Sequence, residues 1–223
     1  MNTKVRDVMT DHVVAVRPDA SFKELAARFH EHRVSGFPVI DANRRVIGVV
    51  SEADLLVKEA LADEHGIPAA LTGILHHKDH RKAEGLTARE LMTRPAVTVR
   101  LEDSVEHAAR LMYTLQVKRL PVVDSGGFLV GIVSRADLLS VFDRADEEIR
   151  SEIVNDVILH EFLIDPAVFM VAVADGVVTI QGSPETNDLG HKLVSKVRQV
   201  RGVVAVRDKL AYPPAEQLIT GLF

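Results

Sequence analysis

The stretch GVVSEADLL at residues 48–56 returns as GIVSRADLL at residues 131–139, and this recurrence decides the fold. The same offset of 83 residues carries other segments onto each other without an insertion: RDVMT at 6–10 onto RELMT at 89–93, and PVID at 38–41 onto PVVD at 121–124. Copies of one supersecondary unit usually bury their hydrophobic faces against each other. The sequence therefore predicts two repeats related by a pseudo-twofold axis.

The sequence of each copy predicts the order β-α-β-β-α, because short apolar runs indicate strands and apolar residues at helical spacing indicate helices. A capping box is expected to open the first helix of each copy, from Ser21 with Glu24 and from Asp103 with Glu106. The expected elements are strands 13–16, 37–40 and 46–50 with helices after Ser21 and Ser51, and strands 97–99, 120–123 and 128–133 with helices after Asp103 and Ser134.

This order and these motifs resemble the CBS domain family, in which a tandem pair forms a Bateman module. The matching residues are the V-M-T opening, GFPVID at 36–41, RLPVVD at 119–124 and G-x-V-S-x-A-D-L-L in both copies. The resemblance covers roughly residues 4–144. It implies a mixed α/β (α+β) fold, an adenine nucleotide as regulatory ligand, and a homodimer formed through the helices.

The chain after Arg144 has a different pattern. Residues 148–162 predict an amphipathic helix, and Asp175-Gly176 between two β-rich runs predicts a hairpin. A second helix is expected from Ser183 as N-cap, with Pro184 in its first turn, to Gly202, before a strand at 203–210. This α-β-β-α-β order resembles a BON domain, through V-x-V-x-D-G-x-V-x-I-x-G at 171–182 and GVV-x-V at 202–206. In that family the domain is associated with phospholipid or envelope components.

The predicted boundaries follow from these patterns. Repeat 1 spans residues 1–61 and repeat 2 spans 89–145, separated by a polar connector at 62–88. The BON-like domain spans 146–212, and 213–223 form a tail. The connector contains His76-His77-Lys78-Asp79-His80, which we interpret as solvated rather than as a metal site, because charge runs are usually exposed.

The start of the second helix in each copy is the candidate binding site, at Ser51/Asp54 and Ser134/Asp137. Ser-x-x-Asp can be a capping box alone, yet a helix N-terminus also attracts anions. The CBS resemblance implies that Asp54 and Asp137 hold ribose and that the serines contact ribose or phosphate. It also implies adenine contacts from the flanking segments, at Thr10, Val13 and Val14 and at Thr93, Ala96 and Val97, although Val14 and Val97 are equally compatible with a core role.

The second copy alone carries cations at this site. Lys118 and Arg119 precede Pro121, where the first copy has Ser35-Gly36, and Arg135 replaces Glu52. Arg and Lys bind phosphate strongly, and in nucleotide-sensing family members the positions matching Lys118 and Arg119 contact phosphate. Solvated surface cations are the alternative interpretation. The sequence leaves open which copy's Asp shares a ligand with Lys118 and Arg119.

Composition narrows the function classes. The chain has no Cys, which excludes thiolate nucleophiles and Cys-ligated zinc. No helical zinc motif, phosphate-cradling loop, nucleophile elbow or dinucleotide fingerprint is present, so we expect neither an enzyme nor a metal site. The net charge of −5 arises from residue 146 onward, with 12 acidic and 7 basic residues, which disfavours nucleic acid as a partner. The N-terminus lacks the apolar core of a signal peptide, and we expect a cytoplasmic protein.

Two functional hypotheses remain. In the leading one, the CBS pair binds AMP, ADP or ATP and modulates the BON-like domain or an unknown protein partner. In the other, the protein is a scaffold or envelope-associated protein, its BON-like domain binds a partner or phospholipid, and the CBS pair is structural.

Overall fold

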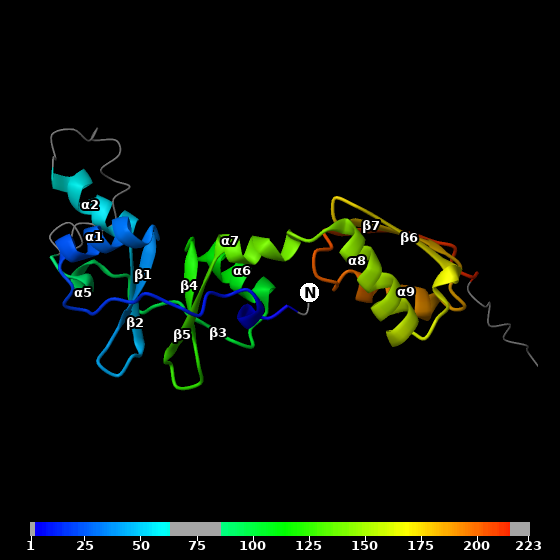
Figure 1. Cartoon of the computed structure of the whole chain (residues 1–223), viewed down its shortest axis with the longest axis horizontal. Coiled ribbons are helices and arrows are strands. Elements are labelled where there is room, and N and C mark those ends of the chain that lie inside the picture. Colours follow the sequence, from blue (N-terminus) through cyan, green and yellow to red (C-terminus); the bar gives the residue numbers. More distant parts are fainter. Residues whose placement is uncertain (1–2, 63–85, 215–223) are drawn as a thin grey trace, which may run out of the picture. The chain divides into compact units, whose positions relative to one another are not determined.

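The computed structural model describes residues 3–62 and 86–214. They divide into two compact units, each considered by itself (Figure 1). The first comprises the described residues of 4–103 and 107–135, and the second comprises residue 3, residues 104–106 and residues 136–214. The predicted connector, with His76 to His80, lies almost entirely outside the described residues.

The first repeat contains α1 (Phe22–His32), β1 (Gly36–Ile40), β2 (Val46–Ser51) and α2 (Glu52–Ala62). Strands β1 and β2 are antiparallel, with Phe37 opposite Val50. The strand predicted at 13–16 is reduced to a single parallel bridge between Val16 and Val39. The hydrophobic core of this repeat includes Leu25, Phe29 and Phe37, whose side chains are buried.

The second repeat contains α5 (Ala88–Leu91), β3 (Val99–Arg100), α6 (Val105–Thr114), β4 (Arg119–Val123), β5 (Leu129–Ser134) and α7 (Arg135–Leu139). A short 3-10 helix at Ser140–Phe142 follows, and another, Val5–Asp7, lies near the N-terminus. The sheet order is β3-β4-β5, with β3 parallel and β5 antiparallel to β4. The β-α-β-β-α order expected from the sequence is therefore present in the second copy, with a two-residue first strand, whereas in the first copy the bridge at Val16 stands in place of the first strand.

The two predicted capping boxes have different outcomes. The Ser21 hydroxyl accepts a hydrogen bond from the Glu24 amide at 3.2 Å, as an N-cap should. The box predicted from Asp103 and Glu106 is wrong, because the helix begins only at Val105. The Asp103 carboxylate instead accepts the Arg100 amide at 2.7 Å and stabilises the turn before the helix.

The segments that lead into the two repeats cross over within the first unit. Thr10, before the strands of repeat 1, pairs with Ile132 in β5 of repeat 2, and Thr93, before the strands of repeat 2, pairs with Val49 in β2 of repeat 1. Thr93 stands 83 positions after Thr10, and Val49 stands 83 positions before Ile132, so the two pairs are equivalent under exchange of the repeats. The Arg45–Phe128 bridge joins two residues that are themselves 83 apart. The pairing pattern thus has the pseudo-twofold symmetry that the repeat predicts.

The second unit has the predicted α-β-β-α-β order of its main elements. It contains α8 (Asp146–Glu152), continued by a π-helix at Ile153–Glu161, a 3-10 turn at Pro166–Val168, β6 (Phe169–Ala174), β7 (Val177–Gly182), α9 (Asn187–Val197) and β8 (Ala205–Leu210). The sheet order is β6-β7-β8, with an antiparallel and then a parallel pair. Asp175 and Gly176 form the hairpin turn with φ of 51° and 70°, as expected of a turn that needs positive φ at both positions.

The limits predicted for the last helix are wrong at both ends. The helix begins at Asn187 with Thr186 as its N-cap in place of the predicted Ser183: Thr186 has an extended backbone, and its hydroxyl accepts the Leu189 amide at 3.2 Å. It ends at Val197, before the predicted Gly202. A Cβ on Gly202 would lie 2.8 Å from Ile149 Cδ1, and φ is +92°, so this glycine allows close packing against α8.

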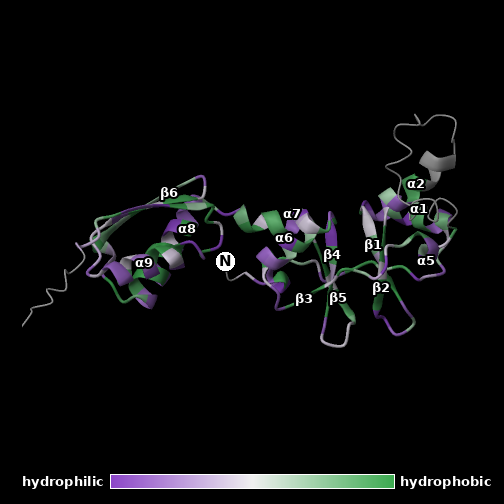
Figure 2. Cartoon of the chain, turned by 180° about the vertical axis from the view of Figure 1, so that it is seen from behind, coloured by the Kyte–Doolittle hydropathy of each residue, from purple (hydrophilic) through white to green (hydrophobic). Residues whose placement is uncertain are grey.

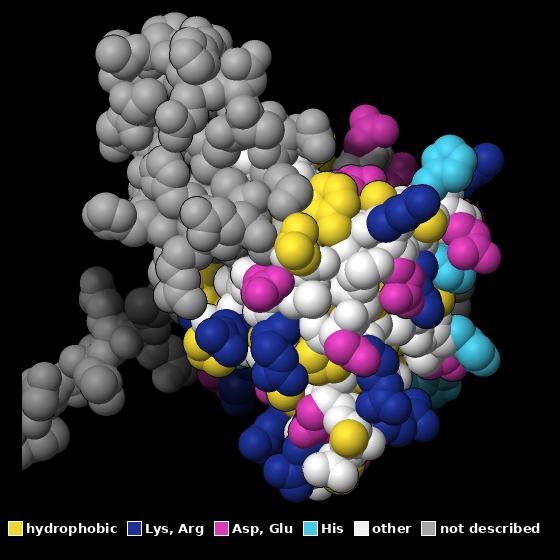
Figure 3. Space-filling model, turned by 90° about the vertical axis from the view of Figure 1, so that its left-hand side faces the viewer, with side chains coloured by type: hydrophobic (Ala, Val, Ile, Leu, Met, Phe, Trp, Pro, Cys, Tyr) yellow, Lys and Arg dark blue, Asp and Glu magenta, His cyan; other side chains and the backbone are white. Residues whose placement is uncertain are grey.

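Apolar residues concentrate on the strands, whereas the turn between β1 and β2 is hydrophilic (Figure 2). On the face shown in Figure 3, Lys and Arg side chains are interspersed with Asp and Glu, which is typical of a solvated surface. Over residues 3–62 and 86–214, no helix has the length and apolar character needed to span a membrane.

Candidate functional site

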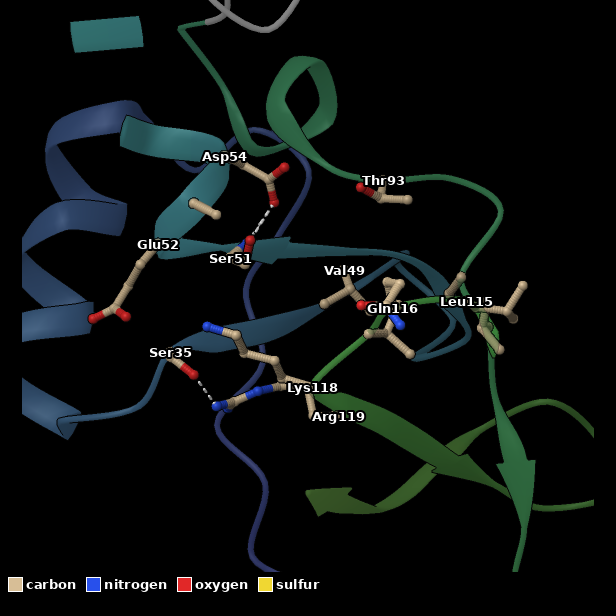
Figure 4. A pocket seen from close by; sticks show the side chains of 14 residues that line it. Ser35, Val49, Ser51, Glu52, Asp54, Thr93, Leu115, Gln116, Lys118 and Arg119 are labelled. Atoms are coloured by element: carbon tan, nitrogen blue, oxygen red, sulfur yellow. Dashed lines mark hydrogen bonds between the residues drawn. The ribbon is translucent and has the colours of Figure 1, made fainter. Parts of the chain in front are cut away.

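A cavity of about 360 Å³ lies in the first unit and is lined by residues of both repeats (Figure 4). This volume falls in the usual range of small-molecule sites. Three groups of side chains surround it, from the start of α2, from the segment after α5, and from the segment that enters β4. The lining residues are Ser35, Val49, Ser51, Glu52, Ala53, Asp54, Thr93, Ala96, Val97, Leu115, Gln116, Val117, Lys118 and Arg119.

Asp54 is held in place by the residue at which α2 begins. Its Oδ2 accepts hydrogen bonds from the Ser51 amide and from the Ser51 hydroxyl, both at 2.8 Å. Asp54 therefore satisfies the Ser51 amide in the manner of a capping box, while the Ser51 hydroxyl donates rather than accepts in this bond. Asp54 is only 9% exposed, so the pocket lining includes a buried carboxylate that Ser51 holds in place.

Lys118 and Arg119 contribute positive charge from the second repeat. The Arg119 guanidinium donates to the Gly36 carbonyl at 3.0 Å and also to the Ser35 hydroxyl. It is half-buried and spans from β4 to the start of β1. Lys118 is exposed, and its amine extends into the view toward the start of α2 (Figure 4). Lys118 is therefore available to a ligand, whereas Arg119 also connects the two repeats.

The remaining wall is largely apolar. Ala96, Val97 and Leu115 line it together with Val49 of β2. Thr93 is kept against this wall by its pairing with Val49. An apolar surface between a buried carboxylate and a pair of cations suits a ligand that has a flat apolar part, vicinal hydroxyls and an anionic group, since each part then meets a complementary surface.

The CBS domain model matches residues 5–60 and 88–144, together about half of the chain. The chain belongs to the CBS domain family. The pocket lies between the two matched segments of this CBS pair, and no part of it comes from the second unit.

Two chloroplastic proteins of Arabidopsis thaliana are among its curated relatives. CBSX1 is 32% identical over 146 residues, which cover 61% of this chain and 60% of CBSX1. CBSX2 is 32% identical over 165 residues, which cover 68% of this chain and 66% of CBSX2. The chain thus spans about two thirds of the length of these relatives.

The fold also matches solved CBS pairs. The crystal structure of CBSX2 in complex with AMP has a TM-score of 0.53 and 34% identity, and the match covers 61% of this chain and 93% of that one. A CBS domain pair of protein MJ0100, at 24% identity and a TM-score of 0.50, supports the fold. These matches confirm the mixed α+β fold of the pair.

The structure brings half of the predicted site residues into the pocket. These are Ser51, Asp54, Thr93, Ala96, Val97, Lys118 and Arg119. Asp54, rather than Asp137, therefore shares a pocket with Lys118 and Arg119, which the sequence could not decide.

The other predicted site residues do not line this pocket. Thr10 pairs with Ile132, Val14 packs against the core of the first repeat, and Pro121 is buried in β4 opposite Ile132. The Arg135 guanidinium donates to the Val117 carbonyl at 3.3 Å. Val13, Ser134 and Asp137 are likewise outside the lining. Most of these residues are the counterparts, 83 positions away, of residues that do line it.

Sequence reasoning missed Ser35, Val49, Glu52, Ala53 and residues 115–117 as lining residues. For Ser35 and Glu52 a signal was available, because they stand 83 positions before Lys118 and Arg135. The 115–117 segment gave no comparable signal, since it approaches the pocket only through the way the repeats pack.

Proposed function

We propose that the CBS pair is a regulatory, non-catalytic module that binds an adenine nucleotide in the pocket of the first unit. The observation that carries this proposal is the joining of a buried carboxylate from one repeat with two cations from the other. A nucleotide offers a ribose to the first and a phosphate to the second. The structure of the relative CBSX2 with AMP supports the choice of an adenine nucleotide.

Each side chain then has a specific role. Asp54, fixed by Ser51, accepts hydrogen bonds from the ribose hydroxyls. Lys118 and Arg119 bind the phosphate by charge-assisted hydrogen bonds. The adenine lies against Ala96 and Val97, and Thr93 contributes backbone contacts beside it.

Calorimetric titration with AMP, ADP and ATP tests this function. We expect at least one nucleotide to bind and Asp54→Asn to weaken it by about tenfold or more, because a ribose hydroxyl then donates to a neutral amide oxygen. Asp137→Asn is the matched control, 83 positions away and outside this pocket. The proposal fails if the three nucleotides do not bind at ~1 mM, a concentration that detects even weak sites. It also fails if Asp54→Asn leaves their affinities unchanged while the variant remains folded.

We further propose that the second unit is a BON-like domain whose presentation, or whose protein partner, responds to the nucleotide in a cytoplasmic protein. A ligand can produce such a response only by binding two states with different affinity. The α-β-β-α-β order of this unit supports the assignment. In the alternative, the protein is a scaffold or envelope-associated protein in which this unit binds a partner or phospholipid and the CBS pair is structural. Co-sedimentation with liposomes, with and without AMP, distinguishes the two: binding that ignores AMP favours the scaffold.

We also propose that the protein is a homodimer through the CBS helices. Leu56 of α2 is 65% exposed, and its counterpart 83 positions later, Leu139 of α7, is 66% exposed. Each is a large exposed apolar side chain at the equivalent position of its own repeat, and a partner subunit that covers either one would bury apolar surface. Light scattering of the wild type and of Leu56→Ser/Leu139→Ser tests the dimer, which this pair of changes should weaken.

A further inference from the structure

The charged side chains that line the pocket balance each other. Glu52 and Asp54 contribute two negative charges, and Lys118 and Arg119 contribute two positive charges. Among the described residues, these four are the charged side chains that line the pocket. A ligand with several negative charges therefore meets no excess of positive charge there.

The N-terminus of α2 adds little further attraction for an anionic ligand. A helix N-terminus favours anions through its unpaired amides and dipole. Both acids of the pocket lie in the first turn of this helix, and Asp54 Oδ2 already accepts the Ser51 amide. The carboxylates of Glu52 and Asp54 thus already compensate the favourable field at this helix end.

The cations are also unequal. Arg119 is committed to the Gly36 carbonyl and the Ser35 hydroxyl, which hold its guanidinium between the repeats. Lys118 is the exposed cation, and in Figure 4 its amine and the Glu52 side chain extend toward the same end of the pocket. Lys118 can neutralise the charge of one phosphate, and Glu52 is the other exposed charged side chain of the described lining.

We propose that Glu52 makes this pocket selective for a nucleoside monophosphate over the di- and triphosphate. This inference rests on the proposed nucleotide binding and concerns which nucleotide binds. Like charges at close range in a partly desolvated site repel, so each added phosphate weakens binding. The second repeat provides a natural contrast, because Arg135 occupies the position equivalent to Glu52.

The test is calorimetry of AMP and ATP with the full chain, in EDTA so that no divalent cation masks the triphosphate. We expect wild type to prefer AMP, and Glu52→Gln to reduce that preference by about fivefold, as expected for one charge at this range. Glu52→Arg, which copies the second repeat, should reduce it further or reverse it. Glu185→Gln is the control: Glu185 is an exposed residue of the second unit, outside this pocket lining, and its removal changes the net charge equally.

The outcomes separate this inference from the proposed function. If none of the nucleotides binds, the proposed function itself fails. If AMP binds but ATP binds equally well, the selectivity is overturned and the nucleotide function stands. A wild-type preference for AMP that Glu52→Gln and Glu52→Arg both leave intact would also overturn the role of Glu52. A preference that falls with increasing salt in wild type but not in Glu52→Gln supports it, because salt screens the repulsion.

Discussion

The backbones of Thr93 and Val49 exchange two hydrogen bonds, from Thr93 N to Val49 O at 2.8 Å and from Val49 N to Thr93 O at 3.1 Å. This pairing attaches the segment that precedes the strands of the second repeat to the sheet of the first repeat. Ala96, Val97 and Lys118 of the second repeat therefore line the same pocket as Asp54 of the first repeat. The pocket is a consequence of this crossed pairing.

The equivalent crossing at β5 requires a glycine. A Cβ on Gly131 would lie 2.5 Å from Met9 Sδ and 3.1 Å from the Thr10 carbonyl oxygen. We expect Gly131→Ala to lower the free energy of unfolding of the first unit by about 1–3 kcal/mol, as overpacking usually does. Thermal or urea unfolding followed by circular dichroism measures this loss. Met9→Ala in the same chain should restore part of it, since the flexible sulfur is the nearer obstacle; an unaffected single variant would contradict this account of the crossing.

Substitutions of Arg119 and Lys118 should show that the first residue contributes to the stability of the fold and the second mainly to AMP binding. Arg119→Ala removes the two cross-repeat hydrogen bonds to Gly36 and Ser35, and we expect a loss of about 1.5–3 kcal/mol, as for hydrogen bonds from a charged donor. Arg119→Lys should lose most of the same stability, because an ammonium lacks the planar fork that reaches both acceptors. Lys118→Ala should leave stability within about 0.5 kcal/mol, as exposed changes do, and weaken AMP binding. Equal stability losses for Lys118→Ala and Arg119→Ala would refute this division.

The sequence predicted the repeat, the two antiparallel strands of each copy and the second-unit hairpin well, but it overestimated the first strand of each copy. The strands are short apolar runs, and the hairpin depends on Asp175-Gly176, so both signals are local. The start of α9 was misplaced because Ser183-Pro184 and Thr186 are both good local starts. The choice between Asp54 and Asp137 was out of reach, because it depends on long-range pairing such as Thr93 with Val49.

The carboxylate of Asp146 is expected to stabilise the hairpin turn between β6 and β7 in the second unit. Its Oδ2 accepts the Asp175 amide and its Oδ1 accepts the Gly176 amide, each at 2.8 Å. Asp146→Ala should destabilise this unit by about 1.5–3 kcal/mol, because two charge-assisted bonds are lost. Glu147→Ala removes only an exposed ion pair with Arg150 and should cost less than about 0.5 kcal/mol. Hydrogen exchange of the Asp175 and Gly176 amides reports the change directly, and amides that stay protected in Asp146→Ala would rule out this role.

Tyr212 should make the stability of the second unit depend on pH in the alkaline range. Its hydroxyl donates to Asp208 Oδ2 at 2.6 Å, and burial together with this bond raises the pKa of Tyr212 to about 12 from 10.0. A raised pKa means that folding favours the protonated form. The contribution is therefore complete below pH ~10 and is lost as the pH rises toward about 12.

The measurement is a titration of tyrosinate absorbance in a Tyr113→Phe background, where Tyr212 is the remaining one of the chain's two tyrosines. Asp208→Asn should bring the pKa of Tyr212 down, because the neutral amide no longer repels the phenolate. The same variant should lose stability near neutral pH yet show less further loss between pH ~10 and ~12. A Tyr212 that titrates near 10 in the folded wild type would show that its hydrogen bond to Asp208 does not persist in solution.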